Sequence, residues 1–200
     1  MISFNNNFIN NIDDYKKFRF ITGIGSRKVP NDIYNVMKHL VLYIHTKTIN
    51  SPEPIVWRSG GANGCDSAIE SDAHNKEIFL PWKQFNNNPS QLTLEDISNN
   101  KIKEAQQILS DVRNVKSMNT MVKKFHTRNV FQVFGQDLET PSMCVLCWTP
   151  DGVEHHTQVT RNTGGTGTAI SLASLYNIPV FNIFNMESFD RFAELIDNIS

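Results

Sequence analysis

A segment rich in glycine and threonine near the end of the chain has the composition of a phosphate-binding loop. Residues 163–168 read Thr-Gly-Gly-Thr-Gly-Thr, and we expect an amphipathic helix to follow over residues 170–176. Glycines allow backbone N–H groups to approach a phosphate closely, and the start of a helix carries partial positive charge. The residue order differs from the P-loop, which has a lysine after its last glycine, and from the dinucleotide fingerprint GxGxxG. The loop therefore predicts an anion site of another kind.

Two more glycine-bearing turns follow predicted strands. Residues 23–27 read Gly-Ile-Gly-Ser-Arg after a strand expected at 18–22, and residues 59–64 read Ser-Gly-Gly-Ala-Asn-Gly after a strand expected at 55–57. In an open parallel sheet, ligands bind outside the carboxyl ends of the strands. Because each turn can supply backbone donors at that edge, the three loops together predict a ligand that carries phosphate.

Strands and helices alternate along almost the whole chain. The strands are expected at residues 18–22, 55–57, 78–80, 143–148 and 180–184, and the helices at 32–46, 65–75, 102–111, 120–134, 170–176 and 189–199. Such alternation predicts an α/β fold with a Rossmann-like, mostly parallel sheet and helices on both faces. Two hundred residues suit a single domain, residues 1–200, with an insertion or lid over the polar, asparagine-rich residues 83–119.

Composition and charge narrow the class of protein. A net charge of −1, with 40% hydrophobic and 20% charged residues, is ordinary for a soluble globular protein and gives no general attraction for nucleic acid. No apolar run approaches the roughly 20 residues that span a membrane, and residues 1–11 lack the pattern of a signal peptide. We therefore expect a cytoplasmic protein that does not enter a membrane.

Two features that resemble metal or redox motifs are interpreted as structural. Cys144 and Cys147 have CxxC spacing, but side chains three residues apart on a strand point to opposite faces, so we expect buried thiols here and at Cys65. The adjacent pair His155 and His156 is expected to point its rings apart, within a solvated β-hairpin over residues 153–162. We expect neither a metal nor a cofactor.

With these elements assembled, the chain resembles the Smf/DprA–LOG superfamily, or SLOG, of Rossmann-like nucleotide-binding domains. The matching segments lie in the same order along most of the chain: residues 23–27, 59–66, 80–82 (Leu-Pro-Trp), 126–129 (His-Thr-Arg-Asn) and 163–168. The chain is most similar to small stand-alone members from bacteria and phages. The resemblance implies a protein that binds a nucleotide or a nucleotide-derived small molecule, including signalling compounds built from NAD or a cyclic nucleotide. It also implies a homodimer or a higher homo-oligomer.

The loops and the resemblance together predict which residues contact the ligand. Ser26 and Arg27 follow a glycine turn, where a hydroxyl and a guanidinium can meet phosphate oxygens. Asp66 starts a predicted helix, where its carboxylate either caps backbone N–H groups or accepts a hydrogen bond from a ribose hydroxyl. The full predicted set is Gly25, Ser26, Arg27, Gly60, Gly61, Asn63, Asp66, Arg128, Asn129, Gly164, Gly165, Thr166, Gly167 and Thr168.

Catalysis is the main alternative to binding. In the LOG phosphoribohydrolases, a basic residue similar to Arg128 supports cleavage of the N-glycosidic bond of a nucleoside monophosphate. Its partner there is a glutamate three positions after the threonine of the GGxGT motif, and the matching position here is Ser171. Without that carboxylate the reaction loses its main group. The candidate catalytic residues are therefore Arg128 with Asp151 and Glu154, which follow the fourth predicted strand.

Single-stranded DNA binding of the DprA type is a second alternative. It requires a basic stripe and aromatic side chains on which bases stack. Six basic residues in and after the insertion are candidates for such a stripe: Lys101, Lys103, Arg113, Lys116, Lys123 and Lys124. Acidic residues are interleaved with them, which favours a solvated helical surface. Nucleic acid is therefore not the favoured partner.

Overall fold

A five-stranded sheet in which all neighbouring strands run parallel forms the centre of the protein. The computed structural model describes residues 19–198. The strands are β1 (Phe20–Gly25), β2 (Val56–Ser59), β3 (Lys76–Ile78), β4 (Cys144–Trp148) and β5 (Val180–Asn182). Their order across the sheet is β3-β2-β1-β4-β5. The predicted α/β class with a parallel sheet is confirmed. Phe18, Ile199 and residues 1–11, which entered the predictions above, lie outside the described residues.

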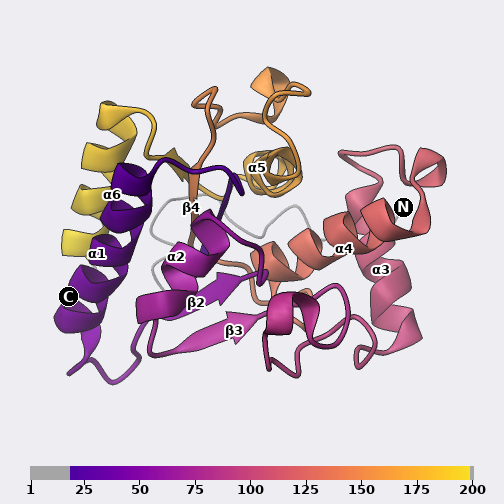
Figure 1. Ribbon diagram of the computed structural model, residues 1–200, viewed down its shortest axis with the longest axis horizontal. Coiled ribbons are helices and arrows are strands. Elements are labelled where there is room, and N and C mark those ends of the chain that lie inside the picture. The colour runs from indigo at the N-terminus through magenta and orange to yellow at the C-terminus, as the bar shows by residue number, and fades with distance from the viewer. Residues whose placement is uncertain (1–18, 199–200) are drawn as a thin grey trace.

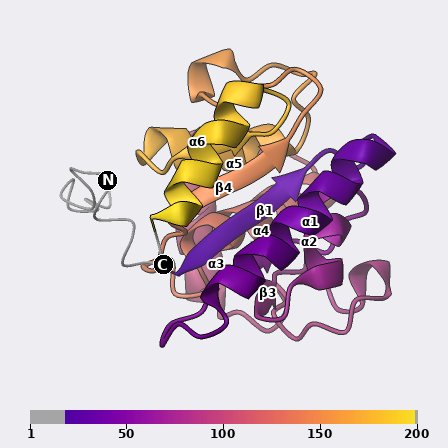
Figure 2. The ribbon, with the colours of Figure 1, turned by 90° about the vertical axis from the view of Figure 1, so that its left-hand side faces the viewer.

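Helices cover both faces of the sheet. One side carries α1 (Asn31–Thr48), α2 (Cys65–Asp72) and α6 (Met186–Asp197), and the other carries α4 (Thr120–Phe134) and α5 (Thr166–Leu175), as Figures 1 and 2 show. The helix α3 (Asn99–Leu109) packs against α4 (Figure 1). Among residues 19–198, no helix combines the length and the apolar character of a membrane span.

The inner strand β4, which lies between β1 and β5, illustrates how the sheet is buried on both faces. All five of its residues are buried, and they form a continuous apolar run, as is typical of a strand covered by helices on both sides. The thiols of Cys144, Cys147 and Cys65 are free and buried, as predicted. Burial raises the pKa of all three thiols, so they stay protonated and behave as small apolar groups.

Helix boundaries follow local capping groups. The helix predicted at 120–134 is confirmed at both ends, because the Asn119 side chain accepts from the Val122 N–H and Gly135, with φ 79°, ends it. The helix predicted at 102–111 begins earlier, at Asn99, because Ser98 accepts a hydrogen bond from the Lys101 N–H. The helix predicted at 170–176 likewise begins earlier, at Thr166.

The third strand and the helix before it differ from the prediction. The helix expected at 65–75 ends at Asp72, since Ala73 adopts an extended conformation. The strand expected at 78–80 lies at Lys76–Ile78. Leu80 forms an isolated parallel bridge to Thr93 instead, so the insertion pairs briefly beside the sheet.

The secondary structure of two polar segments differs from the expectation. The insertion 83–119 contains η2 (Phe85–Asn87), α3 and η3 (Val115–Ser117). The predicted β-hairpin over 153–162 is wrong: it holds a short 3-10 turn, η4 (His156–Gln158), and no strand. The rings of His155 and His156 lie 4.2 Å apart, so the prediction that they point apart is also wrong. In residues 19–198, no group of three or more His, Cys, Asp or Glu side chains is arranged to hold a metal ion.

Candidate functional site

The first two glycine turns and the end of β4 meet at one point of the sheet edge. In the order β3-β2-β1-β4-β5, β2 and β3 are added on one side of β1, and β4 and β5 on the other. Open α/β sheets bind ligands at such a switch point in the strand order. There the N–H of Ser26 donates to the carbonyl of Trp148 (3.0 Å), and the N–H of Cys65 donates to the carbonyl of Ser26 (3.2 Å). Backbone hydrogen bonds therefore fix these turns relative to each other.

The third loop ends in an open helix start. Gly165 is the N-cap residue of α5, and no side chain caps this helix. The amide of Asn129 on α4 donates to the Gly165 carbonyl (3.1 Å), and the hydroxyl of Thr163 donates to Asp151 (2.7 Å), which together hold the loop in place. A Cβ atom at Gly164 or Gly165 would have no described neighbour within 4 Å. The N–H groups of Gly167 and Thr168 donate to the carbonyls of Gly164 and Gly165, whereas those of Gly165 and Thr166 have no hydrogen-bond partner among the described residues. Free N–H groups at a helix start beside open space form an arrangement that binds anions.

A buried ion pair joins α4 to the second loop. Nη1 of Arg128 lies 3.3 Å from Oδ2 of Asp66, and the exposed fractions of the two residues are 6% and 1%. The guanidinium rests against Gly60, where a Cβ atom would collide with Nη1 and Cζ of Arg128. Among the described residues, Nε of Arg128 and Oδ1 of Asp66 are buried without a hydrogen-bond partner. Buried polar atoms are normally paired, so one donor and one acceptor here are available to a bound molecule.

The pKa shifts of this pair reflect burial opposed by mutual attraction. Burial lowers the pKa of the Arg128 guanidinium, and the charge of Asp66 acts in the opposite direction. Burial raises the pKa of the Asp66 carboxyl, which Arg128 opposes. The charge of Arg27 lowers the pKa of Arg128 further, so the two arginines are within electrostatic range. Arg27 is exposed and forms no ion pair with any other described residue.

The second loop is tied to α2. Oε1 of Glu70 accepts from the N–H of Gly61 (2.9 Å) and from the hydroxyl of Ser59 (2.6 Å), while Oε2 accepts from the amide of Asn88 (2.9 Å). The N–H of Gly61, predicted to contact the ligand, is thus already occupied by a carboxylate. Asn63, at the tip of the same loop, is exposed.

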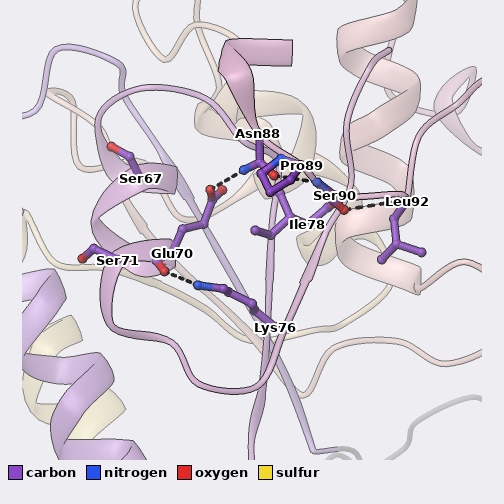
Figure 3. A pocket seen from close by; sticks show the side chains of 9 residues that line it. All are labelled: Ser67, Glu70, Ser71, Lys76, Ile78, Asn88, Pro89, Ser90 and Leu92. Carbon is purple, nitrogen blue, oxygen red and sulfur yellow. Dashed lines mark hydrogen bonds between the residues drawn. The ribbon is translucent and has the colours of Figure 1, made fainter. Parts of the chain in front are cut away.

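An open depression of about 610 Å³ lies next to this loop, between α2 and the insertion (Figure 3). It is lined by Ser67, Glu70, Ser71, Lys76, Ile78, Asn88, Pro89, Ser90 and Leu92. Lys76 donates to the backbone carbonyl of Glu70 (2.6 Å) and Ser90 donates to the carbonyl of Ile78 (2.6 Å), so both polar groups are used within the protein. None of the predicted ligand-contacting residues lines this depression. It is therefore not the site indicated by the glycine loops.

Thr168 is bound by two side chains that the sequence did not assign to the site. Nε of Arg113 donates to its hydroxyl oxygen (3.0 Å), and Nδ1 of His126 lies 2.7 Å from the same oxygen. Thr168 is fully buried, and its hydroxyl already takes part in this internal network. Burial, followed by the charges of Arg113 and Arg128, lowers the pKa of His126 to about 4, and its ring is neutral at pH 7. Thr166 is also buried.

The two candidate catalytic carboxylates both have structural partners. Partial burial acts to raise the pKa of Asp151, but hydrogen bonds from Thr163 and Thr149 prevail and lower it, so the group is ionised. Oε1 of Glu154 accepts from the N–H of Asn182 (3.0 Å), and Oε2 pairs with Arg191 (2.7 Å). Glu154 therefore joins β5 to α6.

Taken together, the described site is rich in donors and poor in acceptors. It combines the open start of α5 with Arg27, Arg113 and Arg128, and Asp66 is the carboxylate in direct contact with this group. Comparison of the chain with protein-family models, with curated proteins and with solved structures finds no match. The function is therefore argued from these residues.

Proposed function

We propose that the protein binds a nucleotide or a nucleotide-derived small molecule, with its phosphate at the switch point of the sheet. One observation carries the proposal: an open, uncapped helix start at Gly164 and Gly165 is joined through Asn129 to α4, which also carries the buried Arg128, whose Nε has no partner among the described residues. Both are donor groups whose natural partner is an anion.

The surrounding groups suit the rest of such a ligand. Phosphate oxygens accept from the N–H groups at the start of α5, while Ser26 and Arg27 approach from the end of β1. Oδ1 of Asp66, an acceptor without a donor among the described residues, suits a ribose hydroxyl. The resemblance to SLOG domains supports the same class of ligand. The homo-oligomer and the cytoplasmic location that we expect stay predictions.

A matched pair of substitutions at one position tests the proposal. Gly165 has a φ of −66° and open space around its Cβ position, so Gly165→Ala should fold normally, and its uncharged methyl group should weaken binding far less than a carboxylate does. Gly165→Asp places a carboxylate at the anion site, and we expect it to abolish binding while the circular dichroism spectrum stays unchanged. Binding is measured by calorimetry against mono-, di- and cyclic nucleotides, after native mass spectrometry of the purified protein for a retained ligand. Equal affinity of the two variants would refute the placement of the phosphate.

The described contacts favour binding over the two alternatives. For a nucleotide N-glycosidase, Ser171 replaces the glutamate, and Glu154 is already paired with Arg191. For single-stranded DNA binding, Lys101 pairs with Glu104 (3.0 Å) and Lys124 lies 3.8 Å from Glu95, which reduces the positive charge that a DNA groove requires.

A further inference from the structure

Arg113, which lies just after α3 in the insertion, is a half-buried cation without a carboxylate partner in the described part of the chain. Burial lowers its pKa, and no acidic group counteracts this shift. Nε donates to Thr168, and no hydrogen bond from either Nη group to another described residue is present. Partly buried arginines usually pair with an anion, because removing the charge from water is costly. The Nη groups of Arg113 are therefore available to an anionic ligand.

The position of Arg113 adds to the positive charge at the start of α5. Its Nη2 lies 3.2 Å from the place of a Cβ at Gly167, so the guanidinium sits over the first turn of α5. A helix start carries partial positive charge and normally attracts acidic groups. Arg113 thus adds a full positive charge to an end that is already positive.

Further positive charge lies on α4. Both Arg113 and Arg128 contribute to the lowered pKa of His126, so the His126 ring is within electrostatic range of each arginine. Arg128 pairs with Asp66 through Nη1, but its buried Nε is unpartnered. Asn129, 3% exposed and bonded to the Gly165 carbonyl, also has an unpartnered Oδ1. Asn129 thus joins α4 to the start of α5, while Arg113 lies over the first turn of the same helix.

We propose that Arg113 binds a second anionic group, so that the ligand carries a diphosphate, with one phosphoryl group at the start of α5 and the other at Arg113. This inference rests on the proposed function and names the charge of its ligand. A monophosphate neutralises one of these centres, whereas a diphosphate reaches both. Thr168 positions the guanidinium by accepting from Nε, which leaves the Nη groups to the ligand.

The test uses inorganic pyrophosphate and inorganic phosphate, which are independent of the identity of the base. We expect calorimetry on the full chain to give tighter binding of pyrophosphate than of phosphate. Arg113→Gln should weaken pyrophosphate binding by about 10- to 100-fold, the range for loss of charge-assisted hydrogen bonds, and leave phosphate binding nearly unchanged. Arg113→Lys should keep part of the difference, because it retains the charge without the planar fork. Lys103→Gln, which removes an exposed charge from the same insertion, is the matched control and should bind both anions normally.

Each outcome has a definite meaning. Equal affinity for the two anions, or equal losses for both in Arg113→Gln, would overturn the role of Arg113 and leave the proposed function standing. Binding of neither anion nor any nucleotide would refute the proposed function itself. If Arg113→Gln lowers the melting temperature strongly, the comparison is made with Arg113→Lys, in which equal losses for both anions would again reject the inference.

Discussion

Gly60→Ala is the substitution that best tests the buried ion pair. The backbone of Gly60 is not in the left-handed region, so alanine is allowed there. The new methyl group would nevertheless collide with the guanidinium of Arg128, which therefore has to leave its place beside Asp66. The substitution thus displaces a side chain on α4 from a loop that follows β2.

The size of the effect follows from what Asp66 loses. Removing one partner of a buried ion pair costs about 3–5 kcal/mol, because the other charge is left buried and alone. Here Arg128 is displaced rather than removed, so we expect a loss of about 2–3 kcal/mol in the free energy of unfolding. For a chain of this size that corresponds to a drop in Tm of about 4–12 °C. Nucleotide affinity should fall as well, since Nε of Arg128 moves with the guanidinium.

Thermal and urea denaturation measure this loss, and a double-mutant cycle assigns its cause. If the collision with Arg128 is responsible, Gly60→Ala should cost little in an Arg128→Ala background. Gly165→Ala is the control for a glycine in open space and should leave stability nearly unchanged. Full additivity of Gly60→Ala and Arg128→Ala, or wild-type stability of Gly60→Ala, would show that the described contact does not hold Arg128.

Two further predictions concern His126 and catalysis. Between pH 6.5 and about 4 the unfolded chain takes up a proton on His126 that the folded protein does not, so the free energy of unfolding should decline as the pH falls through this window. His126→Gln should flatten this decline, as measured by urea denaturation at each pH. An unchanged pH profile in the variant would contradict the lowered pKa of His126. The resemblance to the LOG enzymes predicts a glutamate where this chain has Ser171, and Glu154 is paired with Arg191, so chromatography should detect no free base after hours with nucleoside monophosphates. Turnover that disappears in Asp151→Asn would show that Asp151 supplies the carboxylate.

The elements of the fold were predictable where the signal is local. The helix α4 was predicted at both ends because its apolar spacing is a local signal, and its two caps, Asn119 and Gly135, directly flank it. The start of α3 was missed by one turn, although Ser98 is a recognisable cap. The β-hairpin was wrong because His155 and Gln158 form a capped 3-10 turn, and neither side chain is a usual signal for one.

The contacts within the site depend on distant residues and were only partly predictable. Asp66 and Arg128 were both in the predicted set, but their pairing joins positions 62 residues apart. Arg113 was noted only as one of several basic residues, because nothing local indicates that it lies over Thr168, 55 residues later. Glu70 had a weak local signal, since it stands one helical turn after Asp66 on α2, yet its bond to Gly61 depends on how the loop folds back.

The structure also separates two uses of glycine that look alike in the sequence. Gly25 lacks a side chain because a Cβ would collide with Sγ of Cys65, and Gly60 because it would collide with Arg128, so both permit close packing beneath the site. Gly164 and Gly165 have no neighbour in that position, and Gly164 has a φ of +68°, which suits glycine. Their lack of side chains leaves space that the protein itself does not fill. The first two turns therefore place Arg128 and Asp66, whereas the third presents the open helix start, and the anion binding that we propose at α5 would depend on all three.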